Sequence, residues 1–295
     1  SDQCSAEAVK PAEESVAPER LRRAETVLAH RTSRLLLVLE QCMDSHNHQA
    51  VLRTAEALGV QNVWLINANE RQVKKHKSGT KKITKNCSVW LTIREFTSIV
   101  DCIEALRTDG RTIWATDLAP EAMRMTLADK PTELPEKLAI VIGREIDGVS
   151  QEMLDAADKR IYFPIFGFTE SLNLSVATAL VLQRMFDWFP DIRGDLTDEE
   201  KETIRAQWYP QIVSNPTQRA QAAHWLEHTE EIEPLADLRR EKLAWNDKWV
   251  PKSVKRRELE MPQVQERSNR NDDGNDDKKD KDGKDETHKR ETVDE

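Results

Sequence analysis

The chain lacks the features by which several protein classes are recognised. Its four cysteines include no C-x-x-C pair and no spacing typical of metal ligands, so the sequence predicts free thiols in a reducing compartment. No apolar run approaches the roughly 20 residues needed to span a bilayer. No hydrophobic stretch typical of a secretory signal stands near the N-terminus. We therefore expect a soluble intracellular protein, cytoplasmic unless it is directed to an organelle.

Large hydrophobic residues are also missing from the end of the chain. From Glu266 to Glu295 only Val293 is an aliphatic residue of any size, and no residue is aromatic. Such a segment cannot bury enough apolar surface to offset the entropy of ordering it. We expect residues 258–295 to form a disordered charged tail, and residues 1–18, which are rich in Glu, Ala and Pro, to be disordered as well.

Positive charge is concentrated in short segments although the whole chain is acidic. The formal net charge is −9, and the segment from Glu266 onward, with 12 acidic and 8 basic residues, contributes −4 of it. Between Arg71 and Lys85 lie seven basic residues and no acidic one, and a second basic group spans 248–257. Such runs are typical of a solvated loop or of a nucleic-acid contact, and composition alone leaves both interpretations open.

Short β-rich runs alternate with helical patterns through residues 19–190. Several runs are apolar throughout, as expected of strands buried on both faces of a parallel sheet. The predicted strands are Leu35–Leu39, Asn62–Ile66, Ser88–Ile93, Thr112–Thr116, Leu138–Ile142 and Arg160–Phe163. The predicted helices are Glu19–His30, Gln49–Leu58, Glu95–Arg107, Gln151–Ala157 and Asn173–Trp188. The alternation indicates an α/β domain over 19–190 with helices on both faces of its sheet.

The pattern becomes purely helical after Leu196. Thr197, with Glu200 three positions later, is typical of a capped helix start. Helices are predicted near Asp198–Trp208, Thr217–His228 and Pro234–Trp249. They are too small for an independent domain, so we expect residues 191–257 to be an extension that packs on the main domain.

Three loops follow predicted strands, where open α/β sheets bind ligands. After the first strand, Asn47 lies near a helix start, where it could act as a cap. Arg53 follows among apolar neighbours and must find an anionic or carbonyl partner, which could be a structural ion pair or a ligand.

The second loop runs from Gly143 to Ser150. Two glycines five residues apart allow a sharp turn or a close approach of backbone to a ligand. The spacing is similar to that of a phosphate-binding loop, but Val149 stands where the phosphate-binding lysine belongs, so a nucleotide triphosphatase is disfavoured.

The third loop leads from the strand ending at Phe163 into a helix of small residues. Its apolar side chains, Phe163, Phe166 and Leu172, stand beside the polar Ser171 and Asn173. This mixture suits an adenosine-like ligand, which is largely apolar with a few fixed hydrogen bonds.

In order and spacing the three loops resemble the three signature motifs of the SpoU/TrmH family of RNA ribose methyltransferases. The first motif's Asn and Arg fall on Asn47 and Arg53, and the second motif's Gly-x-Glu-x-x-Gly falls on Gly143, Glu145 and Gly148. The third motif's residues fall on Pro164, Gly167, Ser171, Leu172, Asn173 and Ser175. The resemblance covers roughly 20–188, and the downstream helices look like the extension of the tRNA-acting branch.

The resemblance implies a deep trefoil knot at the C-terminal part of the α/β domain. It also implies S-adenosylmethionine as cofactor, and a homodimer with the active site close to the partner subunit. The cofactor would contact the chain near Thr116, Gly143, Phe163 and Leu172. Methyl transfer would go to a ribose 2′-hydroxyl of tRNA, at a D-loop guanosine, with rRNA as the alternative substrate.

The resemblance also assigns roles in catalysis. Because the pKa of arginine lies above about 12, a clamp on the target phosphate is favoured for Arg53 over a general base. The residues expected to position substrate and loops are Asn47, Glu145, Ser171 and Asn173. RNA binding is expected at Arg20, Arg22, Arg23, His46, Lys74, Lys75, Lys81 and Lys82.

Two rival interpretations involve other classes of protein. The sequence from His224 to His228 spells H-x-x-E-H, an inverted zinc-peptidase pattern, but no third ligand is identified, so no metal is expected. A non-catalytic RNA-binding module would keep the basic segments, yet it could lose Arg53 or the third loop, and both are intact.

Overall fold

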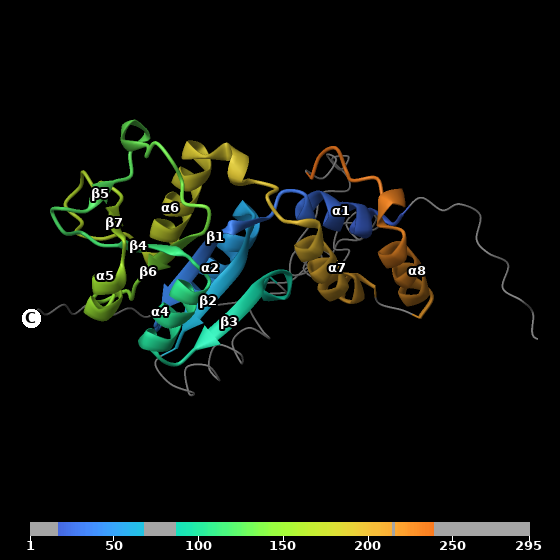
Figure 1. Cartoon of the computed structure of the whole chain (residues 1–295), viewed down its shortest axis with the longest axis horizontal. Coiled ribbons are helices and arrows are strands. Elements are labelled where there is room, and N and C mark those ends of the chain that lie inside the picture. The colour runs from blue at the N-terminus through green and yellow to red at the C-terminus, as the bar shows by residue number, and fades with distance from the viewer. Residues whose placement is uncertain (1–16, 68–86, 214–215, 239–295) are drawn as a thin grey trace, which may run out of the picture. The chain divides into compact units, whose positions relative to one another are not determined.

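The structure is a computed structural model that describes residues 17–67, 87–213 and 216–238. Its centre is a seven-stranded sheet in the order β3-β2-β1-β6-β4-β7-β5, in which every pairing is parallel (Figure 1). The strands are β1 (Thr32–Glu40), β2 (Val60–Ile66), β3 (Thr92–Phe96), β4 (Thr112–Thr116), β5 (Met123–Arg124), β6 (Leu138–Ile142) and β7 (Lys159–Tyr162). The helices are α1 (Glu19–Leu28), α2 (Ser45–Leu58), α4 (Ile99–Thr108), α5 (Gln151–Ala156), α6 (Leu174–Trp188), α7 (Asp198–Ile212) and α8 (Pro216–Glu227).

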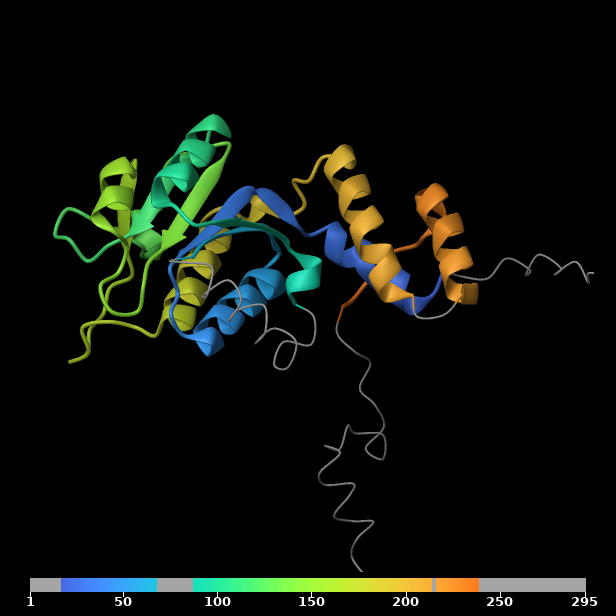
Figure 2. The same ribbon diagram turned by 90° about the horizontal axis from the view of Figure 1, so that it is seen from below.

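Helices cover both faces of this sheet, as predicted. Along β1 the buried side chains alternate, so that Leu35 and Leu37 pack in one core with α2 and α6, whereas Leu36 packs in a second core with α4 and α5. Figure 2 shows the two helix pairs on opposite sides of the sheet. Burial on both faces explains the apolar sequence of β1 and β6.

The strand order reverses between β1 and β6. The chain after β1 enters α2 on one face, and the chain after β6 enters α5 on the other. The two loops leave neighbouring strands toward opposite faces at the carboxyl edge of the sheet, which is where ligands of open α/β folds bind. The first two predicted motif loops are these two connections.

Helices α1, α7 and α8 contribute side chains to a smaller core. Leu21, Trp208 and Trp225 are buried in it. Glu25, only 7% exposed, accepts hydrogen bonds from the Arg205 guanidinium and from the Tyr209 hydroxyl at 2.6 Å. The predicted N-terminal helix therefore packs against the helical extension.

Several element boundaries differ from the predictions. Residues Ser88–Trp90 form the 3-10 helix η1 instead of the start of a strand, and β3 continues to Phe96, past the predicted helix start at Glu95. Helix α4 begins only at Ile99, because the Ser98 side chain accepts from the N–H of Asp101. The short strand β5 was not predicted. Residues 234–238 contain no helix, and the rest of the helix predicted there lies outside the described residues.

Two helices are longer than predicted. Helix α2 starts at Ser45 because the Asp44 side chain accepts from the backbone N–H groups of His46 and Asn47. Helix α7 passes through Pro210 to Ile212, within its last turn. Of the helices in the described ranges, none has the length and apolar character that crossing a bilayer demands.

Candidate functional site

Glu145 joins the first two motif loops at the carboxyl edge of the sheet. Its carboxylate accepts from Asn47 Nδ2 at 3.2 Å, Cys42 Sγ at 3.2 Å and the backbone N–H of Met43 at 3.3 Å. It also accepts from the N–H of Asp44 at 3.4 Å. Desolvation opposes ionisation of Glu145, but these hydrogen bonds outweigh it and lower the pKa of the carboxyl group. The ionised side chain holds the first motif loop against the second.

Asn47 and Asn173 join the first loop to the third. Asn173 Nδ2 donates to Asn47 Oδ1 at 3.0 Å. The Asn173 Oδ1 caps α6 by accepting from the backbone N–H and the hydroxyl of Ser175, at 3.0 Å and 2.7 Å. The chain of hydrogen bonds Glu145–Asn47–Asn173–Ser175 thus connects all three loops through side chains that the sequence singled out. We refer to it as the motif network.

The second loop needs both of its glycines for its own backbone. A Cβ on Gly143 would lie 2.1 Å from the carbonyl carbon of Gly148 and from the nitrogen of Val149. Gly148 has a φ of 73°, in the left-handed region that favours glycine. Arg144 and Gly148 pair through two backbone hydrogen bonds, which close the turn that presents Glu145.

The four predicted cofactor positions follow neighbouring strands or lead into α6. Thr116 ends β4 and donates its hydroxyl to the carbonyl of Val141 at 3.2 Å, Gly143 follows β6, and Phe163 follows β7. Because these strands are adjacent and parallel, the three positions share the carboxyl edge of the sheet. Leu172 lies just before Asn173, and the side chains of Thr116, Phe163 and Leu172 are all half-buried.

Arg53 and Ser171 lie outside the motif network. Six residues along α2 place Arg53 about 9 Å from Asn47 along the axis and about 120° around it. Its guanidinium is exposed and makes no hydrogen bond or ion pair with another described residue. Burial and the charge of Glu56 raise the pKa of the Cys87 thiol, and the charges of Arg53 and Arg31 oppose the rise. Ser171 is exposed, and its carbonyl accepts from Thr169.

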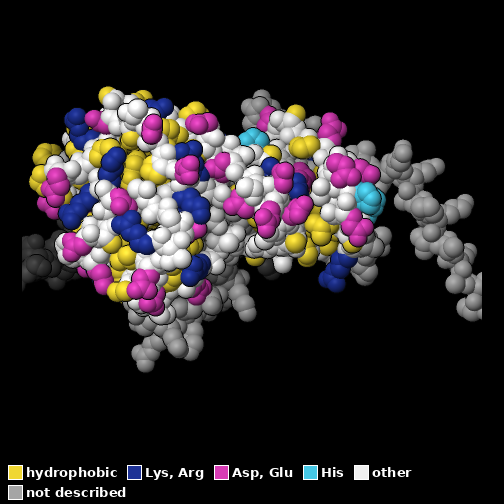
Figure 3. All heavy atoms as spheres, in the orientation of Figure 1, with side chains coloured by type: hydrophobic (Ala, Val, Ile, Leu, Met, Phe, Trp, Pro, Cys, Tyr) yellow, Lys and Arg dark blue, Asp and Glu magenta, His cyan; other side chains and the backbone are white. Residues whose placement is uncertain are grey.

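The predicted RNA-binding residues fall into three groups. Arg20 and Arg23 are exposed on α1, whereas Arg22 donates its Nε to the Glu233 carbonyl at 2.9 Å. His46 is exposed in the first turn of α2, with its Nδ1 3.7 Å from Asp44 Oδ1. The four lysines Lys74, Lys75, Lys81 and Lys82 lie outside the described residues. On the face shown in Figure 3, Lys and Arg side chains are spread over the strand-containing part of the chain.

The two histidines of the H-x-x-E-H segment contact each other at the surface of the chain. The rings of His224 and His228 stack at 4.4 Å, and His228 Nδ1 lies 3.0 Å from the carbonyl oxygen of His224. His224 faces Glu231 at 3.6 Å. Within the described ranges no three His, Cys, Asp or Glu side chains are placed to share a metal ion.

Glu40 is a site residue that the sequence analysis missed. It ends β1, is fully buried, and accepts from the N–H of Ser150 at 3.2 Å, which ties the strand to the far end of the second loop. Desolvation raises its pKa from the ordinary 4.5, although the hydrogen bond from Ser150 opposes the rise. A charged residue at the end of an apolar run gives no sequence signal of burial.

The raised pKa of Glu40 predicts a measurable effect on stability. The folded chain holds this proton more tightly than the unfolded chain, so stability from this group falls as pH rises above 4.5. Glu40→Gln removes the charge, while its NH₂ group adds a cost beside the Ser150 N–H that is the same at every pH. Between pH 4 and pH 8 we therefore expect the Tm of the wild type to fall relative to that of Glu40→Gln by roughly 2–4 °C, about 1 kcal/mol for a protein of this size. An equal relative change in the exposed Glu133→Gln, or none in Glu40→Gln, would contradict this account.

Large apolar side chains stand exposed on the three motif loops and on α6. Met43 is 54% exposed, Ile146 91% and Phe166 95%. Phe168 and Val176 are exposed as well. A concentration of exposed apolar side chains around one site is unusual for a monomer and typical of an interaction surface.

The fold and the motif network define an α/β protein in which polar side chains join three loops at the switch point of a parallel sheet. Residues 34–183 match the model of the SpoU rRNA Methylase family. The chain is 34% identical over 202 residues to a tRNA (guanosine(18)-2′-O)-methyltransferase of Borreliella burgdorferi, covering 68% of this chain and 88% of that protein. It is 31% identical to the Aquifex aeolicus protein of the same name, covering 67% and 92%.

A solved structure agrees with these relatives. The crystal structure of the A. aeolicus TrmH/SpoU tRNA modifying enzyme superposes with a TM-score of 0.55 at 26% identity, covering 66% of this chain and 96% of that one. The chain belongs to the SpoU methylase family, as its three loops predicted.

Proposed function

We propose that this protein transfers a methyl group from S-adenosylmethionine to a ribose 2′-hydroxyl of tRNA, at a guanosine of the D-loop. The observation that carries the proposal is the motif network, which joins three loops far apart in sequence at the switch point of the sheet. The names of the relatives, which specify guanosine 18 of tRNA, support the choice of substrate.

The residues at the carboxyl edge fit the cofactor. Half-buried Phe163 and Leu172 offer apolar surface for an adenine ring, while Thr116 and the backbone at Gly143 offer polar groups beside it. When bound there, S-adenosylmethionine supplies an electrophilic methyl group on its sulfonium. The chain's own task is to align the ribose with that methyl group and to keep the loops in place. Asn47, Glu145 and Asn173 perform the second task through the motif network.

Arg53 is assigned to the substrate phosphate. Its guanidinium is exposed and unpaired among described residues, so it is available for a bidentate contact with an anion. A guanidinium keeps its proton at neutral pH, so Arg53 serves as a clamp that orients the 2′-hydroxyl and does not act as the base.

We further propose that the protein works as a homodimer and contains the trefoil knot that the family resemblance implies. Exposed Met43, Ile146 and Phe166 surround the site and would be covered by a second copy. Within one chain Arg53 lies apart from the motif network. A second copy could place its own residues beside Arg53. Sedimentation of the purified protein tests the assembly.

Labelled methyl transfer tests the function. Purified protein is incubated with S-adenosylmethionine carrying a labelled methyl group and with separate tRNA and rRNA fractions, and the RNA is digested to nucleosides. Label in 2′-O-methylguanosine from tRNA is the expected result. Label confined to rRNA would replace the proposed substrate, and RNA binding without any transfer would favour a non-catalytic module.

Binding to tRNA should depend steeply on salt. Each phosphate neutralised by Lys or Arg releases counterions, so the logarithm of the association constant falls by about 0.7–0.9 per contact for each tenfold rise in salt. Arg23→Gln should lower this slope by about one contact. Titrations of labelled tRNA between low and high salt measure the slope, and a flat response would rule out phosphate-dominated binding.

A further inference from the structure

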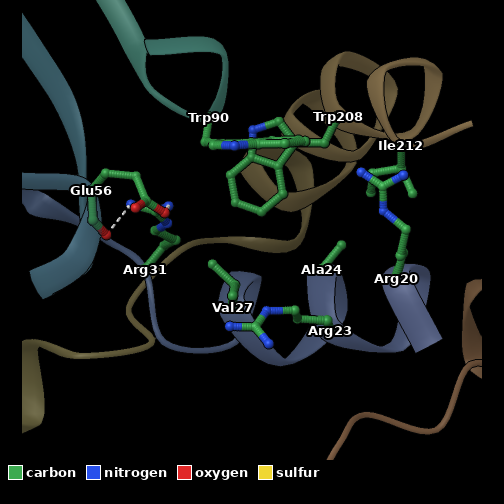
Figure 4. Close-up of a pocket in the computed structure, with 9 residues that line it drawn as sticks. All are labelled: Arg20, Arg23, Ala24, Val27, Arg31, Glu56, Trp90, Trp208 and Ile212. Carbon is green, nitrogen blue, oxygen red and sulfur yellow. Dashed lines mark hydrogen bonds and ion pairs between the residues drawn. The ribbon is translucent and has the colours of Figure 1, made fainter. Parts of the chain in front are cut away.

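A pocket lies between α1, α7 and η1, away from the motif network. Its volume is about 200 Å³, and it is lined by Arg20, Arg23, Ala24, Val27, Arg31, Glu56, Trp90, Trp208 and Ile212. Figure 4 shows the two indole rings on one side and the α1 side chains on the other. Arg20, Arg23, Ala24 and Val27 follow helical spacing, so one stripe of α1 faces the pocket.

Two buried N–H donors of the lining have no acceptor among the described residues. Arg31 is fully buried; its terminal nitrogens donate to the Glu56 carboxylate and to the carbonyls of Glu56 and Val60, but its Nε is unpartnered. Trp208, only 2% exposed, has an unpartnered Nε1. Buried donors without partners are rare in native proteins, and both of these belong to side chains that line the pocket, so acceptor atoms of a bound ligand would be favoured beside them.

The pocket walls favour a flat ligand. Trp90 and Trp208 meet edge to face, with centroids 5.7 Å apart, and the Arg31 guanidinium lies 5.4 Å from the Trp208 ring centre. Trp90 is only half-buried, so part of its ring is open to a partner. Unstacked bases of RNA are bound on such indole rings and guanidinium planes.

The charges around the pocket suit the base and the phosphate of a nucleotide at different places. Inside the pocket the Glu56 carboxylate pairs with Arg31 at 2.9 Å, so the interior offers no net positive charge for a phosphate. Arg20 and Arg23 are exposed and carry no such partner among described residues. A neutral ring with acceptor atoms suits the interior, and a phosphate suits the two arginines.

We propose that this pocket binds one unstacked nucleobase of the RNA substrate, with Arg20 and Arg23 on the adjoining backbone phosphates. The volume agrees, since about 200 Å³ is below the 300–1,000 Å³ typical of small-molecule sites and leaves room for a single base. The inference rests on the proposed function for the identity of the RNA. It adds a second contact that holds the tRNA at a distance from the methylated nucleotide.

Trp90→Ala tests the proposal, with Trp90→Phe as its conservative partner. Stacking of one base on an aromatic ring corresponds to roughly 5- to 150-fold in affinity, so we expect Trp90→Ala to weaken tRNA binding about tenfold or more. Trp90→Phe should restore most of the affinity, and Arg23→Gln should weaken binding where the exposed Arg219→Gln does not. Affinity for S-adenosylmethionine and the Tm of each variant report whether the fold is intact.

The outcomes separate this proposal from the proposed function. If the wild type methylates tRNA and Trp90→Ala binds tRNA as the wild type does, the pocket proposal fails alone. If the wild type leaves tRNA unmethylated while Trp90→Ala still loses affinity for it, the proposed function fails and the pocket proposal stands.

A second measurement covers the case in which Trp90→Ala does not fold. The wild-type protein is cross-linked to tRNA with ultraviolet light, and the attached peptides are identified by mass spectrometry. We expect a nucleotide on the peptide containing Trp90 or on the one containing Trp208. Cross-links confined to other peptides would overturn the proposal.

Discussion

Replacing Arg53 with Ala is expected to reduce methyl transfer by about 100-fold or more, which is typical when a reacting group is no longer held in its productive orientation. The exposed guanidinium makes no contact in the motif network, so its removal should leave the loops and the cofactor residues in place. Single-turnover methylation of tRNA measures the first effect, and calorimetric binding of S-adenosylmethionine the second.

Two further variants test whether the loss of methyl transfer in Arg53→Ala reflects the loss of a phosphate clamp. Arg53→Lys keeps the charge but loses the bidentate fork, and should recover only part of the rate. Arg219→Ala removes an exposed guanidinium from α8 and should change neither quantity. A parallel loss of cofactor affinity and Tm in Arg53→Ala would show that Arg53 is a structural residue, contrary to the clamp.

Glu145→Gln is the second substitution with a large expected effect. The carboxylate accepts from four donors, two of them backbone N–H groups of the first loop, and an amide can accept on only one side. Its NH₂ group would face a donor, and the first loop would lose its attachment to the second. We expect a fall in methyl transfer of about 100-fold and weaker protection of the amides at 43 and 44 in hydrogen exchange.

The lowered pKa of Glu145 predicts how amide protection in the wild type and in Glu145→Gln depends on pH. Because its pKa is lowered in the folded chain, the stabilisation is present above the ordinary value of 4.5 and is lost as pH falls through the lowered value. Wild type should therefore keep amide protection at pH 5, whereas Glu145→Gln should lack it at every pH. Glu152→Gln, exposed on α5, is the matched control, and amide protection in Glu145→Gln equal to that of wild type would refute the attachment.

Much of this architecture can be predicted from the chain, because burial on both faces leaves a clear pattern. Strand β6 begins and ends at the predicted Leu138 and Ile142, and β4 at Thr112 and Thr116. The motif loops were located because each follows a predicted strand and open sheets bind ligands at that edge, and the family resemblance then assigned their residues.

Other features depend on contacts that no local pattern records. Glu40 is buried through pairing with Ser150, over 100 residues away, and Asp44 begins α2 four residues before the apolar periodicity does. Ser88–Trp90 has the composition of a strand but forms η1, whose Trp90 packs edge-on against Trp208 from α7. Such tertiary contacts override the intrinsic preference of a short segment.

The placement of β6 beside β1 has a consequence for how the molecule is made. Leu37 pairs with Ile140, so β1 must wait during synthesis for about 100 further residues before one of its two neighbours exists. Until then, the leucine-rich strand β1 has emerged from the ribosome with one hydrogen-bonding edge unpaired, because β6 has not yet been made. Chaperone binding to nascent chains that end before Leu138, and its release once Ile142 has emerged, would be the physiological trace of this delay.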